Sequence, residues 1–323
     1  MPNLLLTNIC NRKCPYCFAL AQIEAGTTEA NWQMSIEELE VILSYLDPRK
    51  DVVSLLGGEP TLHSDFKQIV QRVCDDGFDV KIFTNGVTKS LRDIHGISKD
   101  SVRIILNLNS PDSYNEREWK QIEKNGSLFQ DQIVLSFNVY QKDFSWDYIK
   151  KAIRDWGLNP FVRIGLAQPI KGMGNSFLQE TDMKEAGSKL VQMAEDCATE
   201  GITLGFDCGF RSCTFSQEQL GILAECGTNL LFVCKPVLDI GPQLDVWRCF
   251  PFSVGPGVTL TDFKSIKELE DYFTDQWSSM QKIGNIDACG DCEKMQLSTC
   301  NGGCLSRTFL RTESIQTTIS DIS

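Results

Sequence analysis

Three cysteines stand within eight residues near the start of the chain, at Cys10, Cys14 and Cys17. They follow the apolar run Leu4–Thr7, which predicts a short buried strand, so they fall on the loop after its carboxyl end. Gaps of three and two residues let one loop turn three thiolates toward one point. Three thiolates suit an iron–sulfur cluster with one iron left open, because such a cluster usually takes four. A structural zinc or disulfide site is the alternative, but no Cys or His follows closely enough to give zinc a fourth ligand.

A second motif follows the next predicted strand. Val52–Leu56 is an apolar run typical of a buried strand, and it ends in Gly57-Gly58-Glu59-Pro60. Two glycines leave the backbone open to the close approach of a ligand, and Glu59 offers a carboxylate to an amine. Taken alone, the segment is equally typical of an ordinary turn.

Predicted strands and amphipathic helices alternate up to about residue 200. The strands are expected at 4–7, 52–56, 80–84, 102–110, 133–140 and 161–167, and the helices at 36–46, 66–74, 146–156 and 181–201. Ser35 and Glu38 predict a capping box, and Gly157 predicts a helix C-cap. The alternation predicts an α/β fold with a parallel sheet and crossover helices. Six strands are too few for a closed eight-stranded barrel, and both motifs fall at the carboxyl ends of strands, where an active site would form.

The first motif, with Tyr16 just before its last cysteine, resembles the signature of the radical S-adenosylmethionine (SAM) superfamily. Gly57–Pro60 matches the GGEP motif of that family. The resemblance implies that Cys10, Cys14 and Cys17 hold a [4Fe–4S] cluster whose open iron binds the amino and carboxylate groups of SAM. An injected electron would split SAM into methionine and a 5′-deoxyadenosyl radical, which abstracts a hydrogen atom.

The resemblance also implies a partial (β/α)6 TIM-like barrel and a set of SAM-binding residues. Tyr16 would lie against the adenine, and the amino group would be held by Gly57, Gly58, Glu59 and Pro60. Polar groups after the fourth strand contact the SAM ribose in the family, which makes Asn109 or Ser110 a candidate. Both residues suit a plain turn before Pro111 equally well, so the two interpretations stay open.

The composition changes near residue 205, after which the chain is rich in Cys, Gly and Pro. We expect a radical SAM partial barrel over residues 1–205, a small Cys-rich auxiliary domain over 206–311 and a polar, disordered tail over 312–323. Of the 14 cysteines, nine fall in the second part: Cys208, Cys213, Cys226, Cys234, Cys249, Cys289, Cys292, Cys300 and Cys304. Cys74 and Cys197 fall on apolar helix faces and are predicted to be core residues.

The end of this cysteine field has metal-ligand spacing. Cys289-x2-Cys292 and Cys300-x3-Cys304 are each able to direct two thiolates at one metal. A zinc ribbon is the alternative, although its paired Cys-x2-Cys spacing is only half met. The field resembles the SPASM (twitch-like) extension of radical SAM peptide and protein maturases, which carries two auxiliary [4Fe–4S] clusters.

The SPASM pattern is matched with three departures. Its first pair corresponds to Cys234 and Cys249 by spacing. Leu244 stands where the pattern has Gly, the gap from Cys292 to Cys300 is two residues longer, and no cysteine follows Cys304. By analogy, the first auxiliary cluster would use Cys234, Cys249 and Cys304 with Cys226 or Cys213. The second would use Cys289, Cys292 and Cys300 with Cys208 or Cys213.

A count of thiolates allows three clusters. They need at most eleven, three for the first cluster and four for each auxiliary cluster, and twelve cysteines lie outside the predicted core positions. A single auxiliary cluster is the fallback. Asp207 is a candidate base for the proton that an oxidised substrate radical must lose, although a surface or capping role is the commoner explanation for such a residue.

We therefore expect a radical SAM enzyme that cleaves SAM and abstracts hydrogen from a peptide or protein side chain, leading to crosslinking or oxidation. Its partners would be a ribosomally made precursor peptide or a protein, a separate leader-binding protein and a reductant such as flavodoxin or ferredoxin. A small-molecule dehydrogenase or rearrangement enzyme is the first alternative, because the motif begins at Cys10 and leaves no room for a leader-binding domain. A non-catalytic iron–sulfur electron carrier or binding protein is the second, and the GGEP segment argues against it.

Charge and hydropathy exclude other classes of partner. The 31 Lys and Arg against 43 Asp and Glu give a net charge of −12, which disfavours nucleic acid or an anionic membrane. No segment reaches the roughly 20 apolar residues that span a bilayer, and no signal peptide is present. A cytoplasmic protein is expected, in which the cysteines are metal ligands rather than disulfides.

Overall fold

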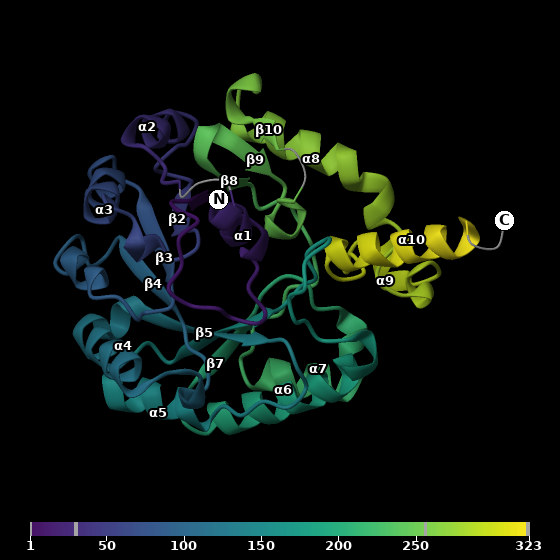
Figure 1. The fold of residues 1–323 in the computed structure, drawn as a ribbon. Coiled ribbons are helices and arrows are strands. Elements are labelled where there is room, and N and C mark those ends of the chain that lie inside the picture. The colour runs from purple at the N-terminus through teal and green to yellow at the C-terminus, as the bar shows by residue number, and fades with distance from the viewer. Residues whose placement is uncertain (1, 29–31, 255–256, 321–323) are drawn as a thin grey trace.

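The computed structural model describes residues 2–28, 32–254 and 257–320. Within them the chain builds a ten-stranded sheet in the order β10-β9-β8-β1-β2-β3-β4-β5-β6-β7 (Figure 1). The strands are β1 Asn3–Leu5, β2 Val52–Leu56, β3 Asp79–Thr84, β4 Val102–Asn107, β5 Ile133–Val139, β6 Phe161–Leu166, β7 Thr203–Phe206, β8 Asp239–Ile240, β9 Asp245–Trp247 and β10 Val258–Thr259. Every neighbouring pair from β8 through β1 to β7 is parallel, and β9 and β10 add antiparallel pairs at one edge.

Helices α2 to α7 lie around the outside of this curved sheet, whereas α9 and α10 lie to one side of it (Figure 1). The helices are α1 Leu20–Thr28, α2 Ile36–Ser44, α3 Phe66–Asp75, α4 Glu116–Phe129, α5 Asp147–Trp156, α6 Met183–Ala198, α7 Gln217–Glu225, α8 Ile266–Gln281, α9 Glu293–Gln296 and α10 Leu305–Ser320. In the described residues no helix combines the length and apolar character needed to cross a membrane.

The core lies between the strands and their crossover helices. Residues such as Leu55, Ile82, Ile104 and Ile164 are completely buried at alternate strand positions, as the period of a strand requires. The sheet does not close, because β7 and β10 remain its edge strands. The α/β fold and the partial barrel predicted from the sequence are therefore confirmed.

The capping box and the C-cap that the sequence predicts are both present. The Glu38 amide donates to Ser35 Oγ at 3.1 Å, and the Ser35 amide donates to Glu38 Oε2 at 2.7 Å, so the capping box of α2 is present. Gly157 ends α5 in the left-handed conformation with φ of +67°, as predicted. Helix α2 ends at Ser44, two residues earlier than expected.

Several elements differ from the sequence prediction. Helix α4 and strand β7 were not expected, and the predicted boundary near 205 falls inside β7. Strands β8 to β10 continue the sheet beyond β1, so residues 206–311 are joined to the barrel by backbone pairing. The expected disordered tail is helical through Ser320, because Phe309 of α10 packs against Trp277 and Phe252. The prediction for residues 321–323 lies outside the described part of the chain.

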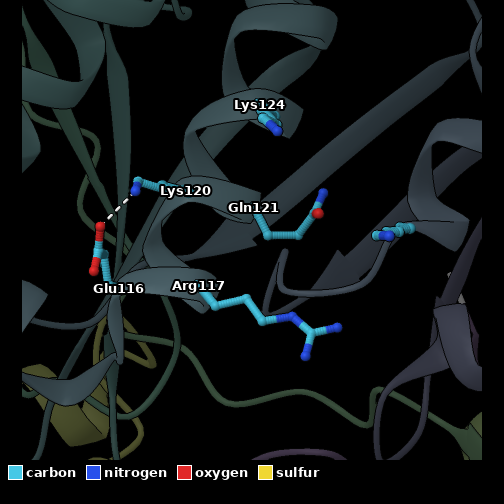
Figure 2. Close-up of a pocket in the computed structure, with 6 residues that line it drawn as sticks. Glu116, Arg117, Lys120, Gln121 and Lys124 are labelled. Atoms are coloured by element: carbon cyan, nitrogen blue, oxygen red, sulfur yellow. Dashed lines mark hydrogen bonds and ion pairs between the residues drawn. The ribbon is translucent and has the colours of Figure 1, made fainter.

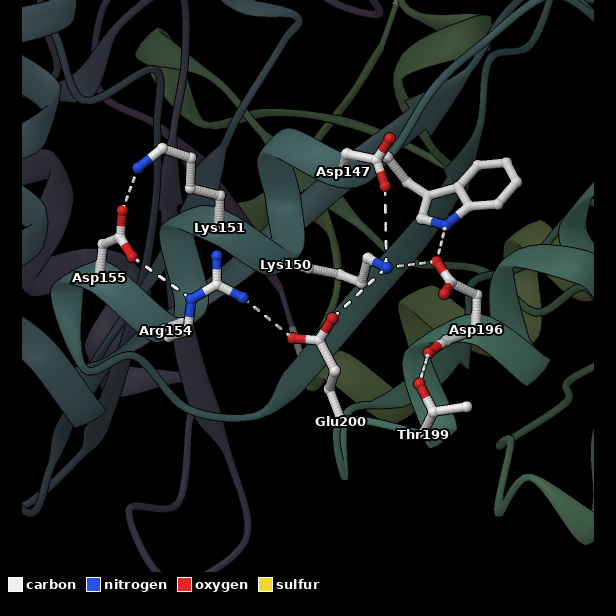
Figure 3. Close-up of polar contacts among 9 residues, drawn as sticks. Asp147, Lys150, Lys151, Arg154, Asp155, Asp196, Thr199 and Glu200 are labelled. Carbon is white, nitrogen blue, oxygen red and sulfur yellow. Dashed lines mark hydrogen bonds and ion pairs between the residues drawn. The ribbon is translucent and has the colours of Figure 1, made fainter.

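An ion-pair network joins the two helices that flank β6 (Figure 3). Lys150 of α5 reaches Asp196 of α6 at 2.5 Å and Glu200 at 3.4 Å, and Trp146 Nε1 donates to Asp196 at 2.6 Å. Only 13% of the Lys150 side chain is exposed, so these contacts are partly shielded from solvent. The network holds α5 and α6 together behind the strand that carries Arg163.

Candidate functional site

The three cysteines of the first motif lie on the loop that leaves the carboxyl end of β1. The Cys17 amide donates to the Cys14 carbonyl at 3.1 Å, which folds the loop back on itself. Burial raises the pKa of Cys10 to about 11 and that of Cys17 to about 12, and the charges of the neighbouring cysteine sulfurs add to both shifts. The three thiols are therefore close enough to interact electrostatically, as the spacing predicted.

Backbone amides oppose part of this rise in pKa. The backbone amide of Arg12 donates to the Cys10 thiol and that of Ala19 to the Cys17 thiol, and both contacts lower the thiol pKa. No three His, Cys, Asp or Glu side chains in the described ranges are grouped tightly enough to hold a single metal ion. Three sulfurs with N–H groups directed at them are the donor set that an iron–sulfur cluster takes.

The two glycines of the second motif pack directly on the segment that precedes Cys10. The Gly58 amide donates to the Thr7 carbonyl at 2.7 Å, and the next amide donates to the Ile9 carbonyl at 2.8 Å. A Cβ at Gly58 would lie 2.3 Å from the Ile9 oxygen, and one at Gly57, whose φ is +151°, would lie 2.4 Å from the Thr7 oxygen. The glycines are thus required by the close approach of two backbone segments.

Glu59 organises the end of β3 through a buried carboxylate that is 1% exposed. It accepts hydrogen bonds from the Asn85 amide at 2.8 Å, Thr84 Oγ1 at 2.6 Å and Thr61 Oγ1 at 2.5 Å. Burial raises the pKa of the carboxyl, and these donors oppose the shift. Asn85 Nδ2 in turn donates to Asn11 Oδ1 at 2.8 Å, which ties the network to the cysteine loop.

Tyr16 and Asn109 meet, although they are 93 residues apart in the chain. The Tyr16 hydroxyl contacts Asn109 Oδ1 and accepts from Asn107 Nδ2 at 3.0 Å, and the ring stacks on Tyr140 with centroids 4.8 Å apart. Asn109 Nδ2 lies 4.0 Å from Cys14 Sγ. The structure therefore places the end of β4 beside the cysteine loop.

The two other predicted SAM contacts begin short 3₁₀ turns. Pro60 is the first residue of the turn Pro60–Leu62 and is buried. Ser110 precedes the turn Pro111–Ser113, and its carbonyl accepts from the Ser113 amide at 2.9 Å. Ser110 thus has the turn geometry that the sequence left open.

Arg12, which the sequence analysis did not single out, fixes the outer side of the cysteine loop. Its guanidinium pairs with Glu118 of α4 at 3.1 Å, donates to the Ser113 carbonyl at 2.8 Å and lies 4.2 Å from the centre of the Tyr114 ring. An arginine between two motif cysteines was the available signal. It connects the loop after β1 to the helix after β4.

Asp207, the predicted base, follows β7 and forms an ion pair with Arg163 of β6. Arg163 also donates to Ser136 Oγ at 3.0 Å and lies 5.2 Å from the centre of the Phe83 ring. Burial raises the pKa of the Asp207 carboxyl, and the Arg163 charge opposes this rise. A carboxylate with a raised pKa accepts protons more readily than an ordinary surface aspartate.

One set of four cysteines gathers around Arg248. Its guanidinium donates to Cys234 Sγ at 3.5 Å and to Cys249 Sγ at 3.9 Å. Desolvation raises the pKa of Cys208, and the neighbouring Cys304 and Cys234 sulfurs raise it further. Cys249 likewise interacts with Cys304 and Cys234. These electrostatic neighbours favour placing Cys208 with the first set, whereas the resemblance offered Cys208 or Cys213 for the second.

The other set forms where the segment 208–213 packs on the segment 300–304. Desolvation raises the pKa of Cys213, and the sulfurs of Cys289 and Cys300 add to this effect. The Cys292 amide donates to the Cys289 carbonyl at 3.3 Å, which keeps these two residues in one turn. The second set thus comprises Cys213, Cys289, Cys292 and Cys300.

Two contacts fix the packing of these segments. A Cβ at Gly209 would lie 3.7 Å from the Cys304 Cβ, and one at Gly303 would lie 2.9 Å from the Arg211 Cγ.

Leu244, which replaces the glycine of the SPASM pattern, has a φ of +63°, a conformation that favours glycine.

The remaining cysteines lie apart from both sets. Cys226, a predicted candidate for the first set, caps α7, and its thiol interacts with Glu195 and Glu225. Cys197 is fully buried in the core, as predicted, and Cys74 is half-buried at the core edge.

Arg211 and Arg248 are two further residues that were not predicted from the sequence. Their proximity in sequence to Cys213 and Cys249 was the only signal.

Two overlapping hollows lie outside the barrel, beside α4, and Figure 2 shows one of them. One has a volume of about 360 Å³, and its lining residues are Lys89, Glu116, Arg117, Lys120, Gln121 and Lys124. A second, of about 440 Å³, shares Lys89, Arg117 and Gln121 with it and reaches Glu118, the partner of Arg12. The hollows therefore border the element that anchors the cysteine loop.

Comparison with known proteins supports this site. The family model of the radical SAM superfamily matches residues 4–163. Streptococcus suis SuiB bound to precursor peptide SuiA has a TM-score of 0.64 at 16% identity, covering 94% of this chain and 71% of that chain. Native anSMEcpe with bound AdoMet and Cp18Cys peptide has a TM-score of 0.64 at 16% identity, covering 94% of this chain and 88% of that chain. At these identities the likeness shows the fold alone.

Curated relatives match shorter segments. The S-adenosylmethionine-dependent nucleotide dehydratase of Selenomonas ruminantium is 38% identical over 84 residues, which are 26% of this chain and 29% of that protein. A probable GTP 3′,8-cyclase of Methanococcus maripaludis is 30% identical over 129 residues, 39% of this chain and 40% of that protein. The matched segments thus span less than half of these curated relatives.

The backbone approach at Gly58 gives a direct test of the site's architecture. We expect Gly58→Ala to lower the free energy of unfolding by about 2 kcal/mol, because the new Cβ forces the Ile9 backbone away. Gly174→Ala is the matched control, since a Cβ there meets nothing within 4 Å, and its effect should stay within about 0.5 kcal/mol. Urea unfolding of the three proteins measures both values. Equal midpoints for the two variants would contradict the role given to Gly58.

Proposed function

Residues 4–163 form a domain of the radical SAM superfamily, and from this premise we propose that the protein cleaves SAM reductively and abstracts hydrogen from a peptide or protein side chain. The observation that carries the proposal is the cysteine loop, whose three thiols interact at the carboxyl end of β1. Crosslinking or oxidation of the side chain would follow.

Some residues of the site would bind the cluster, and others position the loop that carries its ligands. Cys10, Cys14 and Cys17 would bind a [4Fe–4S] cluster. With SAM bound, such a cluster supplies the one-electron chemistry that generates a hydrogen-abstracting radical. The pairing of Gly58 with Thr7 holds the loop on β2, and the contacts of Tyr16 hold it on β4. The loop is therefore fixed from two sides before any ligand arrives, which favours a preorganised site.

A peptide substrate is supported by the structural relatives. SuiB with its precursor peptide and anSMEcpe with a peptide both share the fold over 94% of this chain, including the Cys-rich part. We propose that the present chain also accepts a peptide or protein. The predicted leader-binding protein would then be a separate partner.

A small-molecule substrate is the second candidate. The nucleotide dehydratase and the probable GTP cyclase are the specific observation in its favour, because both names specify nucleotide substrates. Their similarity covers only 26% and 39% of this chain.

Anaerobic SAM cleavage tests the reaction class. We expect the chain, reconstituted with iron and sulfide, to release 5′-deoxyadenosine when SAM and dithionite are added, as followed by mass spectrometry. Cys14→Ala should reduce the yield to background, because it removes a proposed ligand of the reactive cluster. Cys226→Ala is the control and should retain the activity, since Cys226 lies apart from the proposed ligands.

The results of this assay distinguish the reaction class from the class of substrate. No nucleoside from a chain with a full complement of iron would overturn the proposed reaction. Nucleoside release that rises with a candidate precursor peptide, with deuterium passing from the labelled side chain to 5′-deoxyadenosine, would favour the peptide over a nucleotide. Transfer from a labelled nucleotide would favour the second candidate.

We also propose two auxiliary [4Fe–4S] clusters with four thiolates each. The first would be held by Cys208, Cys234, Cys249 and Cys304, and the second by Cys213, Cys289, Cys292 and Cys300. Cys213 takes the place of the cysteine that the SPASM pattern has after Cys304. The electrostatic contacts within each set support this division.

Iron counting tests the division. We expect about 12 iron atoms per chain in the reconstituted protein, for three clusters of four. Cys213→Ala should lose about one to four of these and show the electron paramagnetic resonance signal of an incomplete cluster, because one thiolate is missing. Cys226→Ala should retain the full count. The division would be refuted if Cys226→Ala lost iron and Cys213→Ala did not.

The basic hollow beside α4 is the proposed docking site of an acidic reductant such as a flavodoxin. Lys89, Arg117 and Lys124 are exposed there, in a chain whose net charge is −12. Such a local positive patch attracts an acidic partner that the rest of the surface repels. The neighbouring second hollow, which shares Lys89 and Arg117, reaches Glu118, which pairs with Arg12 of the cysteine loop, so a docked donor would be near the cluster of Cys10, Cys14 and Cys17.

Charge reversal tests this docking site. We expect Lys89→Glu, Arg117→Glu and Lys124→Glu together to slow cluster reduction by reduced flavodoxin at least about tenfold at low salt, because electrostatic steering is lost. Reduction by dithionite, which needs no docking, should change far less. Lys67→Glu, Lys99→Glu and Lys184→Glu together reverse the same charge at exposed positions elsewhere. Equal rates with flavodoxin in the two triple variants would reject the site.

The role of Asp207 as a base and the cytoplasmic location of the protein stay predictions. Asp207 would accept the proton that an oxidised substrate radical loses, and its raised pKa supports that role. All 14 cysteines are free thiols, which supports a reducing, cytoplasmic setting.

A further inference from the structure

Two arginines are almost fully buried, and each stands beside one of the two cysteine sets. Arg248 is 2% exposed and Arg211 is 3% exposed. Burying a guanidinium away from water costs several kcal/mol unless an anion compensates its charge. The question for each arginine is therefore which group supplies that negative charge.

Around Arg248 the recorded partners are sulfurs. Nη1 and Nη2 lie 3.6 and 3.5 Å from Cys234 Sγ, and Nη1 lies 3.9 Å from Cys249 Sγ. Within the described residues Nε is buried with no hydrogen-bond partner. A neutral thiol is a weak acceptor, so these contacts compensate the charge only if the sulfurs are thiolates. Bound iron keeps them in that form.

The positive charge of Arg211, unlike that of Arg248, is partly neutralised by a carboxylate. Nη2 pairs with Glu180, whose side chain is 49% exposed. Nε and Nη1 are buried and have no partner among the described residues. The Arg211 charge acts on the Cys213 thiol, and its Cγ lies close to Gly303, between the ligand candidates Cys300 and Cys304. Two guanidinium nitrogens, which carry three N–H groups, thus remain without a partner beside the second set.

We propose that Arg248 and Arg211 are positioning residues that compensate the charge of the two auxiliary clusters, one each, and thereby raise their reduction potentials. The inference rests on the two clusters proposed above. Hydrogen bonds and positive charge near cluster sulfurs favour the reduced, more negative state. Because Glu180 neutralises part of the Arg211 charge, Arg211 raises the potential of the second cluster less than Arg248 raises that of the first.

The test is a redox titration of the reconstituted full chain, followed by electron paramagnetic resonance. Arg248→Gln should lower the potential of the first cluster by at least 59 mV, which is a tenfold shift of a one-electron equilibrium, and leave the second unmoved. Arg248→Lys keeps a cation and should restore part of the shift. Arg211→Gln should lower the potential of the second cluster, and Glu180→Gln should raise it.

The controls separate charge compensation from structural damage. Arg49→Gln removes an arginine that is 86% exposed and should shift neither potential. If Arg248→Gln loses the first cluster, retention of that cluster in Arg248→Lys supports the need for a cation. Loss in both variants, or full iron with unmoved potentials, would overturn the inference. An iron count for the unsubstituted chain that allows only one cluster would defeat the proposed cluster set, and this inference with it.

Discussion

The cysteine loop depends on a backbone contact between two segments that follow adjacent strands. The amides after Leu56 donate to the carbonyls of Thr7 and Ile9, and the glycines allow the segments to approach without a Cβ between them. Glu59 is then carried into the core, where its carboxylate gathers donors from the end of β3. One short contact thus sets the position of the thiols and of the third strand's end together.

The Cys-rich part is organised by a different constraint, the need to bury positive charge among sulfurs. The Arg248 guanidinium contacts two cysteines of the first set, and the Arg211 side chain packs against Gly303 beside the second set. The short segment from Cys208 to Cys213 serves both sets because it packs along the segment 300–304. The proposed ligands Cys208 and Cys213 therefore stand at the two ends of one short segment.

The sequence predicts what local chemistry determines. The spacing of Cys10 to Cys17, the capping box at Ser35 and the C-cap at Gly157 need only neighbours in the chain, and each expected element is present. Helix α4 was not predicted because its buried positions include Asn125, which donates to the Gly86 carbonyl, and Gly126, which packs against Trp156. Strand β7 is four residues long and contains a glycine. The neighbours of Cys208 depend on contacts with residues far along the chain, so the resemblance alone left Cys208 and Cys213 as alternatives for the second set.

The position of β1 within the sheet affects how the chain is made. This first strand lies between β2 and β8, and Asn3 donates to Asp239 at 2.6 Å across a separation of 236 residues. A ribosome releases β1 long before its second neighbour exists, so one edge of the strand stays unpaired during most of synthesis. The nascent chain is consequently exposed to mispairing until residues 239–240 emerge, and assistance from chaperones during translation has its clearest target at that edge.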